Sequence, residues 1–300
     1  MNQDQIFQNL VSLLPGIKIF KNYPLAPLTT VKLGGPASIF INPQTTSEFI
    51  SVLKLVQPHP FFILGNGSNV LIPDQGLDKI VIHNDSNSIE YLPNNQVKVD
   101  SGVQLPLLIN QTVDHSLSGL EEYAYIPSTI GGAIFGNIHG TNKNDFNKLL
   151  VSIDIFDTTD QTQKTLNPLD LSWSYDTSEF QQHPNWIILQ ATLQLNPGDS
   201  SLLKQTVVEI ISKKSPIQSM VSLGCVFKNP LNDSAGRIID QELGLKGFVL
   251  GGVQVSPNHA NFIINTGTGT AADYLALIQK IQQLAQAKGF SLETEIKLLQ

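Results

Sequence analysis

The chain has 300 residues, 41% of them hydrophobic and 14% charged, so it can bury two or three cores and is not a disordered chain. Its net charge of −7, with no compensating basic run, argues against general nucleic-acid binding. A single cysteine excludes an internal disulfide framework, and no His, Asp or Glu spacing indicates a metal site. No apolar stretch approaches the ~20 residues that span a bilayer, and the N-terminus lacks a signal-peptide pattern. We therefore expect a cytoplasmic protein without membrane or nucleic-acid partners.

The first third of the chain alternates helical and strand patterns. Apolar residues at helical spacing predict a short opening helix near residues 7–14. Thr45, followed three positions later by Glu48, is typical of a capping box and predicts a helix. The apolar face of that helix is Phe49, Val52, Leu53 and Val56. Strands are predicted at residues 61–64, 70–72 and 79–82.

The middle of the chain is richer in strand patterns, with candidates at residues 97–99, 151–155 and 186–189. The cluster at residues 196–200, Asn-Pro-Gly-Asp-Ser, predicts a turn and is the clearest linker signal. A helix is predicted just after it.

The C-terminal third contains a second strong helical pattern. It opens at Thr270, with Asp273 at the capping-box position, and stops at Gly289. Residues 292–299 are predicted to return as a strand.

A glycine-rich turn between two predicted strands is the most informative stretch of the first half. It reads Gly65-Asn66-Gly67-Ser68-Asn69. A GxG turn lets the backbone approach an anion, and successive N–H groups can form a nest around phosphate oxygens. The dinucleotide fingerprint would need a third glycine and a following helix, and both are missing. The turn alone leaves a simple hairpin open as the alternative.

Two further glycine clusters follow. The first is Pro127-Ser128-Thr129-Ile130-Gly131-Gly132-Ala133, continuing to Asn137, and the second is Gly34-Gly35 after Thr29-Thr30. Proline stiffens the chain, and paired glycines permit close contact with a flat or charged ligand. Each cluster alone is equally typical of an ordinary turn. Three clusters across two predicted domains favour one extended ligand.

The order of these motifs resembles that of the UDP-N-acetylenolpyruvoylglucosamine reductase (MurB) family of peptidoglycan synthesis. The compact length resembles the shorter subtype, which lacks a substrate-covering insertion. The resemblance is colinear over nearly the whole chain. It is carried by residues 22–26, 29–30, 34–37, 64–74, 126–137, 224–230, 235–236, 244–247, 259–262 and 292–295.

The resemblance implies an α+β fold with a two-part FAD-binding region of the FAD-linked oxidase (PCMH-like) type. The two FAD-binding parts are residues 1–82 and 83–199. Residues 200–300 form an α+β substrate-binding domain whose last strand, about residues 291–300, returns toward the flavin site. The family's activity would be FAD-dependent reduction of UDP-N-acetylglucosamine enolpyruvate to UDP-N-acetylmuramate, with NADPH as hydride donor. We expect a monomer whose partner is the small UDP-sugar.

Site residues are implied by the same motifs. The residues that would hold FAD are Gly65, Asn66, Gly67, Ser68 and Asn69 at the pyrophosphate and Pro127, Ser128, Thr129, Gly131, Gly132, Ala133 and Asn137 beside the flavin. Tyr175, Lys228 and Asn229 would bind the UDP-sugar, and Ser128 stands where the family commonly has glycine.

Cys225 lies where the family has a serine that donates a proton. Hydride addition to an enol ether beside a carboxylate leaves a carbanion, which needs a proton donor and stabilisation of the developing enolate. A thiol is more acidic than a hydroxyl, so Cys225 is a plausible donor. The alternative is a buried cysteine that acts as a small apolar residue. Glu295 matches the glutamate that polarises the substrate, for which it must be protonated or share a proton, and Glu293 on the same strand side competes for that role.

Asp176 departs from the family pattern because it occupies the position of an arginine that meets the substrate carboxylate. A carboxylate there would repel the substrate. Either Asp176 turns away, or it is protonated, or another cation substitutes, with Arg237, Lys228 and Lys214 as candidates. Lost activity is a further alternative, so a non-catalytic homologue and an oxidase of the same superfamily stay open. His259 lies in a retained motif assigned to the substrate domain, and His139 follows the second glycine cluster without an assigned role.

Overall fold

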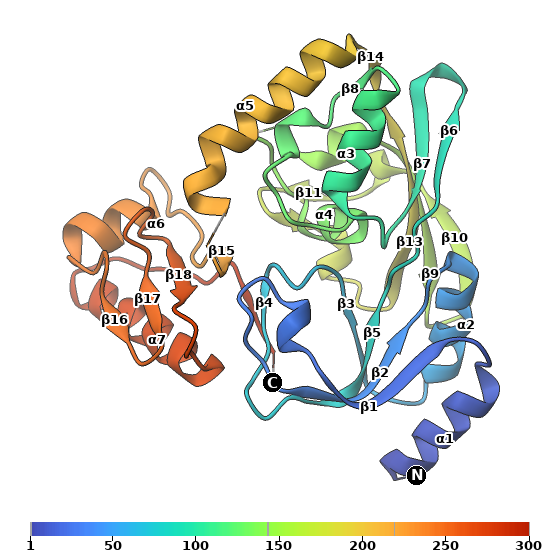
Figure 1. Cartoon of the computed structure of the whole chain (residues 1–300), viewed down its shortest axis with the longest axis horizontal. Coiled ribbons are helices and arrows are strands. Elements are labelled where there is room, and N and C mark those ends of the chain that lie inside the picture. The colour runs from blue at the N-terminus through green and yellow to red at the C-terminus, as the bar shows by residue number, and fades with distance from the viewer. Residues whose placement is uncertain (1, 143, 219, 300) are drawn as a thin grey trace. The chain divides into compact units, whose positions relative to one another are not determined.

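The computed structural model describes residues 2–142, 144–218 and 220–299, and of residues 215–218 only the backbone. The chain divides into two compact units, both drawn in Figure 1. Unit 1 comprises the chain up to Phe20, residues 39–66 and residues 79–214, and unit 2 comprises residues 21–38, residues 67–78 and the chain from Ser215 onward. Three of the five unit boundaries fall inside strands β1, β2 and β5, and the other two fall in the turn after β3 and inside α5.

The helices are α1 (Gln3–Leu13), α2 (Thr46–Val56), α3 (Leu105–Asp114), α4 (Ile130–Gly136), α5 (Ser200–Gln218), α6 (Ala235–Arg237) and α7 (Ala271–Ala287), and a π-helical turn (Ile238–Glu242) follows α6. The longer strands are β1 (Lys18–Pro24), β2 (Pro36–Asn42), β3 (Phe61–Leu64), β5 (Leu77–His83), β6 (Ile89–Leu92), β7 (Gln96–Asp100), β9 (Leu150–Asp157), β10 (Thr162–Leu166), β13 (Trp186–Gln194), β15 (Ser222–Cys225), β17 (Val253–Val255) and β18 (Phe262–Asn265). The two-residue strands are β4 (Val70–Leu71), β8 (Leu117–Ser118), β11 (Trp173–Ser174), β12 (Thr177–Ser178), β14 (Asn196–Pro197), β16 (Val249–Leu250) and β19 (Lys297–Leu298).

An antiparallel five-stranded sheet, ordered β10-β9-β13-β7-β6, is the centre of unit 1. Its strand β13 is buried on both faces. Ile188 points into the core formed with α3 and α4, which cover one face of the sheet in Figure 1, whereas Ile187 and Leu189 join the core formed with α2. A strand between two cores needs apolar residues at successive positions, which explains the unbroken apolar run at residues 186–189.

The core around α2 explains how strand β3 is placed. The four apolar residues predicted for the inner face of α2 are all at most 1% exposed. Strand β3 belongs to the sheet ordered β1-β2-β5-β3 and runs parallel to β5, with Leu64 opposite His83. The glycine-rich turn therefore begins at the carboxyl end of a half-buried parallel edge strand, the end where α/β sheets commonly bind ligands.

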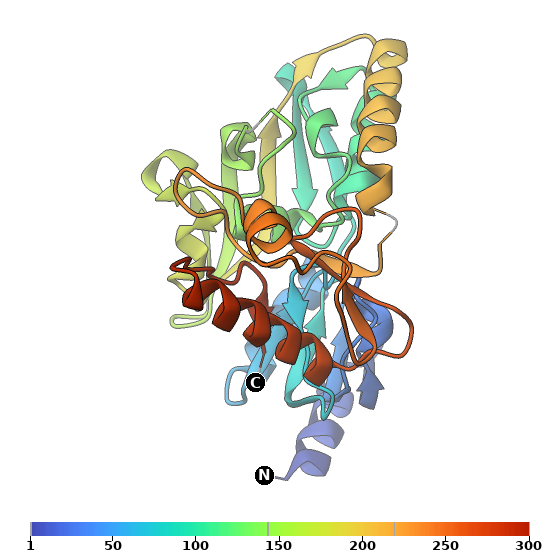
Figure 2. The same ribbon diagram turned by 90° about the vertical axis from the view of Figure 1, so that its left-hand side faces the viewer.

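Unit 2 is built around the sheet β15-β18-β17-β16 and helix α7, the long red helix of Figure 2. The capping box between Thr270 and Asp273 is present as predicted. Asp74 adds a second cap, because its two carboxylate oxygens accept from the N–H groups of Ala271 at 2.8 Å and Ala272 at 2.9 Å. A carboxylate at this end of a helix also interacts favourably with the helix dipole.

The predicted α+β class is confirmed. Three local predictions need correction. Residues Asn196–Pro197 form strand β14, paired with β8, where only a turn was expected. The carboxylate of Glu48 accepts from the N–H of Gln44 at 2.7 Å, so the reciprocal half of the first capping box is displaced by one residue. The predicted final strand is reduced to β19, which pairs in parallel with β4.

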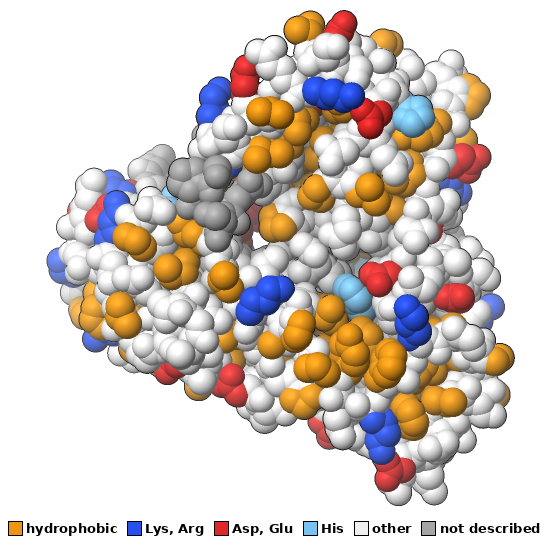
Figure 3. Space-filling view, in the orientation of Figure 1, with side chains coloured by type: hydrophobic (Ala, Val, Ile, Leu, Met, Phe, Trp, Pro, Cys, Tyr) orange, Lys and Arg blue, Asp and Glu red, His pale blue; other side chains and the backbone are white. Residues whose placement is uncertain are grey.

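The surface agrees with the low charge content. On the face shown in Figure 3, acidic and basic side chains are few and spread among uncharged ones, and some of them lie beside a side chain of opposite charge. Within the described ranges, no helix is long and apolar enough to cross a membrane. The same part of the chain contains no group of three or more His, Cys, Asp and Glu residues suited to a metal ion. The expected three-part division at residues 82 and 199 stays a prediction.

Candidate active site

The glycine-rich turn after β3 is fastened to the second glycine cluster within unit 1. The side-chain amide of Asn66 donates to the carbonyl oxygen of Pro127 at 2.8 Å. A Cβ added to Gly65 would lie 2.8 Å from the hydroxyl oxygen of Thr129, too close for any larger residue. The two motifs that the sequence assigned to one ligand are therefore neighbours.

Gly67, in unit 2, is the most constrained position of this turn. Its φ of +60° is left-handed, and an added Cβ would lie 2.4 Å from the carbonyl oxygen of Leu28. The carbonyl oxygen of Gly67 accepts from the N–H of Thr30 at 3.2 Å. Among the residues that the structure describes, the backbone N–H groups of Asn66, Gly67 and Ser68 donate to no protein acceptor. Adjacent unsatisfied N–H groups on a tight turn fit a pyrophosphate.

The second glycine cluster is already satisfied by the protein itself. The N–H of Gly131 donates to the Ser101 carbonyl at 2.8 Å, and that of Gly132 donates to the Thr129 hydroxyl at 3.1 Å. Ser128 is 7% exposed, and its hydroxyl donates to the carbonyl of Thr129 at 2.9 Å. Ala133 is fully buried in the core. This segment is therefore a rigid wall, and the turn at residues 65–69 is the better anion cradle of the two.

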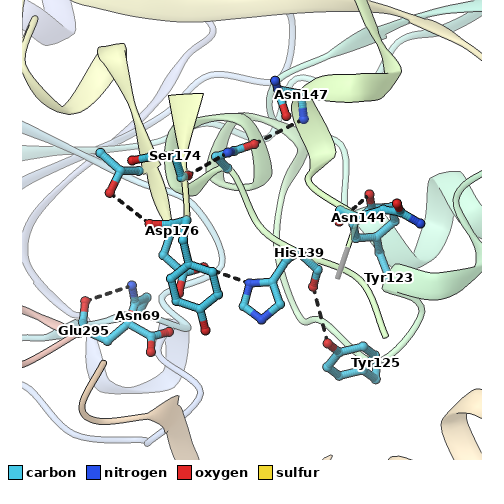
Figure 4. Close-up of polar contacts among 12 residues, drawn as sticks. Asn69, Tyr123, Tyr125, His139, Asn144, Asn147, Ser174, Asp176 and Glu295 are labelled. Atoms are coloured by element: carbon cyan, nitrogen blue, oxygen red, sulfur yellow. Dashed lines mark hydrogen bonds and ion pairs between the residues drawn. The ribbon is translucent and has the colours of Figure 1, made fainter. Parts of the chain in front are cut away.

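Asn137 connects the end of α4 to a short hairpin. Its side-chain amide donates to the carbonyl of Ser174 at 2.9 Å, and its side-chain oxygen accepts from the N–H of Asn147 at 3.2 Å (Figure 4). Asn137 is fully buried. Its position in the fold is therefore structural, and it fixes the strand that leads into Tyr175 and Asp176.

Tyr175 and Asp176 form the turn of that hairpin, between β11 and β12. The carboxylate oxygen Oδ1 of Asp176 lies 3.0 Å from Nδ1 of His139, as Figure 4 shows. Tyr175 packs its ring against the imidazole of His139, with centroids 4.8 Å apart. Asp176 is thus paired with a histidine of its own unit.

Cys225 and Glu295 are brought together within unit 2. Cys225 ends β15, and the carbonyl of the next residue, Val226, accepts from the N–H of Glu295 at 2.8 Å. Phe227 stands opposite Thr294 in an isolated bridge, so the two segments run antiparallel. The side chain of Asn69 donates to the carbonyl of Glu295 at 3.4 Å (Figure 4). The end of the glycine-rich turn, the thiol segment and the glutamate segment therefore lie side by side.

Asn261, which lies in the motif at residues 259–262, holds the backbone of the segment that follows Cys225. Its side chain is 2% exposed, accepts from the N–H of Phe227 at 3.0 Å and donates to the Phe227 carbonyl at 2.8 Å. The motif at residues 259–262, His-Ala-Asn-Phe, indicated that this asparagine matters, but no local pattern indicates which backbone group it binds. His259, in the same motif, packs edge-on against Phe262 at 4.9 Å.

Tyr274 of α7 lies fully buried near Cys225. Burial raises the pKa of its phenol, the backbone of Leu223 acts in the opposite direction, and the nearby thiol adds to the rise. The phenol therefore stays neutral beside the thiol at physiological pH.

Three cationic candidates for the missing arginine are placed by the structure. Arg237 is held by two carboxylates, Asp233 at 2.5 Å and Glu242 at 2.6 Å. The guanidinium holds the pKa of the Asp233 carboxyl at about 2. Lys228 pairs with Glu293 at 2.6 Å, and Lys214 of unit 1 lies over the ring of Tyr125 at 5.0 Å.

Asn229 uses its side-chain oxygen to accept from the N–H of Ala235 at 3.0 Å, which caps α6.

Comparison with known proteins agrees with this geometry. A family model described as FAD binding domain matches residues 37–165, and one for the C-terminal domain of UDP-N-acetylenolpyruvoylglucosamine reductase matches residues 215–299. The chain is therefore an FAD-binding oxidoreductase of mixed α+β architecture.

Relatives with the name UDP-N-acetylenolpyruvoylglucosamine reductase span nearly the whole chain. That of Chlamydia muridarum is 38% identical over 282 residues, which cover 93% of this chain and 94% of the relative. That of Carboxydothermus hydrogenoformans is 37% identical over 277 residues, 90% of each. The crystal structure of the Thermus caldophilus reductase superposes with a TM-score of 0.80 at 31% identity, covering 95% of this chain and 99% of that one. The protein belongs to the UDP-N-acetylenolpyruvoylglucosamine reductase family, and its 300 residues fit the shorter type.

Proposed function

We propose that this protein reduces UDP-N-acetylglucosamine enolpyruvate to UDP-N-acetylmuramate in peptidoglycan synthesis, with FAD as resident cofactor and NADPH as reductant. The observation that supports this most directly is the backbone hydrogen bond from Glu295 to Val226, because it joins the segment of the predicted acid to the segment that contains the predicted proton donor, Cys225. A FAD-binding domain and a reductase C-terminal domain on one chain support it as well.

FAD would be held by the unsatisfied N–H groups of Asn66, Gly67 and Ser68, with the segment from Pro127 to Gly132 as a rigid neighbour. When bound, the flavin relays a hydride from NADPH to the substrate.

Cys225 supplies the proton that completes the reduction. The enolpyruvyl double bond gains a hydride at one carbon and a proton from the thiol at the other, and the thiolate regains its proton from solvent. Cys225 is intermediate in burial and is the last residue of the edge strand β15, just after a register shift between Ser222 and Cys225. A donor held by the backbone on both sides loses little freedom when the substrate binds.

Glu295 is the acid that we assign to the enolate. Its rival, Glu293, is 72% exposed and paired with Lys228 at 2.6 Å. The backbone of Glu295 is bonded to both the thiol segment and Asn69. A protonated Glu295 can donate a hydrogen bond to the developing enolate without repelling it.

The UDP-sugar would be bound by Tyr175, Lys228 and Asn229. Tyr175 is 51% exposed on a hairpin that Asn137 holds, so its ring can stack on a base or sugar. The Lys228–Glu293 pair is exposed, and such pairs are weak, so the ammonium can exchange the carboxylate for a phosphate. Asn229 has its oxygen committed to α6, which leaves its amide Nδ2 as the atom that we expect to reach the ligand.

The test is stopped-flow spectroscopy of the purified, FAD-loaded protein. We expect NADPH to bleach the flavin and the enolpyruvyl substrate to restore its colour anaerobically. A protein that cannot be loaded with FAD would contradict the proposal. So would a flavin that oxygen reoxidises and the substrate does not, which indicates an oxidase. Binding of substrate without reoxidation would identify the non-catalytic homologue that Asp176 first suggested.

We further propose that the protein acts as a cytoplasmic monomer. Its substrate is a charged nucleotide sugar and its reductant is NADPH, which are both available inside the cell. Sedimentation equilibrium at micromolar concentration should give a mass near 32.8 kDa, and a mass near twice that value would contradict the monomer.

A further inference from the structure

The Asp176 carboxylate has an environment that requires a positive partner. Its side chain is 13% exposed, and its Oδ1 atom contacts Nδ1 of His139 at 3.0 Å. Its other oxygen, Oδ2, is buried without a hydrogen-bond partner among the described residues. A carboxylate largely removed from water is stabilised by a close opposite charge, and in return it favours the protonated imidazole. The two side chains therefore form an ion pair whenever the imidazole of His139 is protonated.

His139 is held in place from several sides within unit 1. Tyr175 packs on its ring, with centroids 4.8 Å apart, and the hydroxyl of Tyr125 donates to its carbonyl at 3.4 Å (Figure 4). His139 also forms a backbone bridge with Asp145 and lies two residues after the buried Asn137. Its side chain nevertheless stays 30% exposed, so a ligand can reach the ring.

The other charged groups near His139 come from neighbouring segments. Among the described residues they include Asp176 on the hairpin, Glu122 and Asp145 beside Tyr123, and Lys214 over the Tyr125 ring. Asp176 contacts the imidazole at 3.0 Å. Lys214 acts in the opposite sense to the three carboxylates.

We propose that His139, oriented and kept protonated by Asp176, binds the carboxylate of the substrate and so replaces the arginine that the family pattern has at position 176. This inference rests on the proposed function. An imidazolium with Nδ1 on an aspartate can present its Nε2–H to a second carboxylate, as a charge-assisted hydrogen bond. Asp176 is then a positioning residue that orients the cation, and its own negative charge is neutralised before the substrate arrives. Arg237 and Lys228, two of the cations that the sequence offered for this role, are already paired with carboxylates.

The test compares two ligands that differ in the carboxylate. UDP-N-acetylmuramate has the lactyl carboxylate, and UDP-N-acetylglucosamine lacks it. Binding to the FAD-loaded protein is measured by calorimetry. We expect His139→Gln to weaken UDP-N-acetylmuramate about 10- to 100-fold, as for loss of a hydrogen bond to a charged group, and to change UDP-N-acetylglucosamine less than about 2-fold.

His183→Gln is the matched control. His183 also contacts a carboxylate, Glu179 at 3.4 Å, and also stacks on an aromatic ring, Trp186 at 4.1 Å. We expect this variant to bind both ligands like the wild type. If His139→Gln binds UDP-N-acetylmuramate like the wild type, or loses both ligands equally, the inference is overturned while the proposed function stands. If the wild type binds neither ligand, the proposed function fails and the inference fails with it.

The pH dependence separates this role from a merely structural one. The imidazolium is required, so the wild-type affinity for UDP-N-acetylmuramate should fall as pH rises through the titration of His139. Asp176→Asn keeps a residue type that tolerates the positive φ of +50° at this position but removes the charge that favours protonation. We expect this variant to bind nearly normally at pH 6 and to lose affinity at lower pH than the wild type does. An identical pH profile for Asp176→Asn and the wild type would overturn the pairing.

Discussion

Cys225 is the single residue on which the proposed chemistry depends most. The backbone hydrogen bonds of Val226 with Asn261 and Glu295 fix the segment that follows Cys225 at the end of β15. The backbone contacts that fix this segment are made by the residue that follows the thiol. Since Cys225 is the one cysteine of the chain, any thiol-specific effect can be assigned to it.

Cys225→Ala should separate the two half-reactions. We expect flavin reduction by NADPH to proceed at the wild-type rate, because the thiol takes no part in it, and substrate-dependent reoxidation to slow by ~10²-fold or more, the usual size of a general-acid contribution. Cys225→Ser should recover much of the loss. Stopped-flow absorbance of the flavin measures both steps, and equal reoxidation rates in the alanine variant would remove Cys225 from the mechanism.

The two glutamates of the last segment give a matched pair of substitutions. Glu295→Gln should lower kcat by about 10²-fold, which is the effect of removing one group that stabilises a developing oxyanion. Glu293→Gln breaks an exposed pair with Lys228, so we expect less than about a 3-fold change in kcat. Steady-state kinetics of both variants tests the assignment. The reverse order of effects would transfer the acid role to Glu293.

Among the elements, features that depend on residues close together in the sequence were predicted correctly, whereas strand pairings between distant segments were not predicted. The buried faces of α2 and α7 follow from spacing within one helix, and their caps follow from residues three positions apart. Strand β14 and the shortened β19 depend on β8 and β4, which are distant in sequence. The site shows the same division. The sequence motifs indicated Cys225, Glu295 and the glycine-rich turn as candidates. The contact between His139 and Asp176 joins residues 37 positions apart, and no local pattern indicates it.

The glycine-rich turn can be tested by a pair of substitutions with the same backbone strain. Gly67 and Gly244 both have φ near +60°, but an added Cβ meets the Leu28 carbonyl at 2.4 Å in the first and nothing within 4 Å in the second. Gly244→Ala should cost about 1 kcal/mol, from the left-handed conformation alone. Gly67→Ala should cost about 1–3 kcal/mol more, from overpacking, and should release FAD.

Urea unfolding and the flavin content of the purified variants measure these two effects. The comparison isolates the steric term because the strain is common to both. Equal destabilisation, with FAD retained in Gly67→Ala, would show that the turn can relax and that it is not the cradle of the pyrophosphate.

At the level of the whole molecule, unit 2 is assembled from three stretches of chain, which the sequence does not indicate. Val31, Leu33 and Leu71 are buried in a core otherwise formed by residues after 222. The carbonyl of Val31 also accepts from the side chain of Asn265 at 3.0 Å, and Asp74 caps α7. The family model for the FAD-binding domain matches residues 37–165, a range that includes the glycine-rich turn. Residues 67–78, which begin within this turn, nevertheless belong to unit 2 together with the chain from Ser215 onward.

A chain that ends at Lys214 should therefore not behave as an independent FAD-binding domain. Its Val31, Leu33 and Leu71 side chains would lose their core, at about 1.5–3 kcal/mol each, and residues 67–69 would lose the support of Glu295 and Lys297. We expect aggregation in gel filtration, a broadened or absent thermal transition and no bound flavin. The control is a chain without α1, in which only Leu10 is buried, and it should keep both its fold and its flavin. A monomeric, yellow chain of residues 1–214 that unfolds cooperatively would show that the contacts with the C-terminal segment are dispensable for the cofactor site.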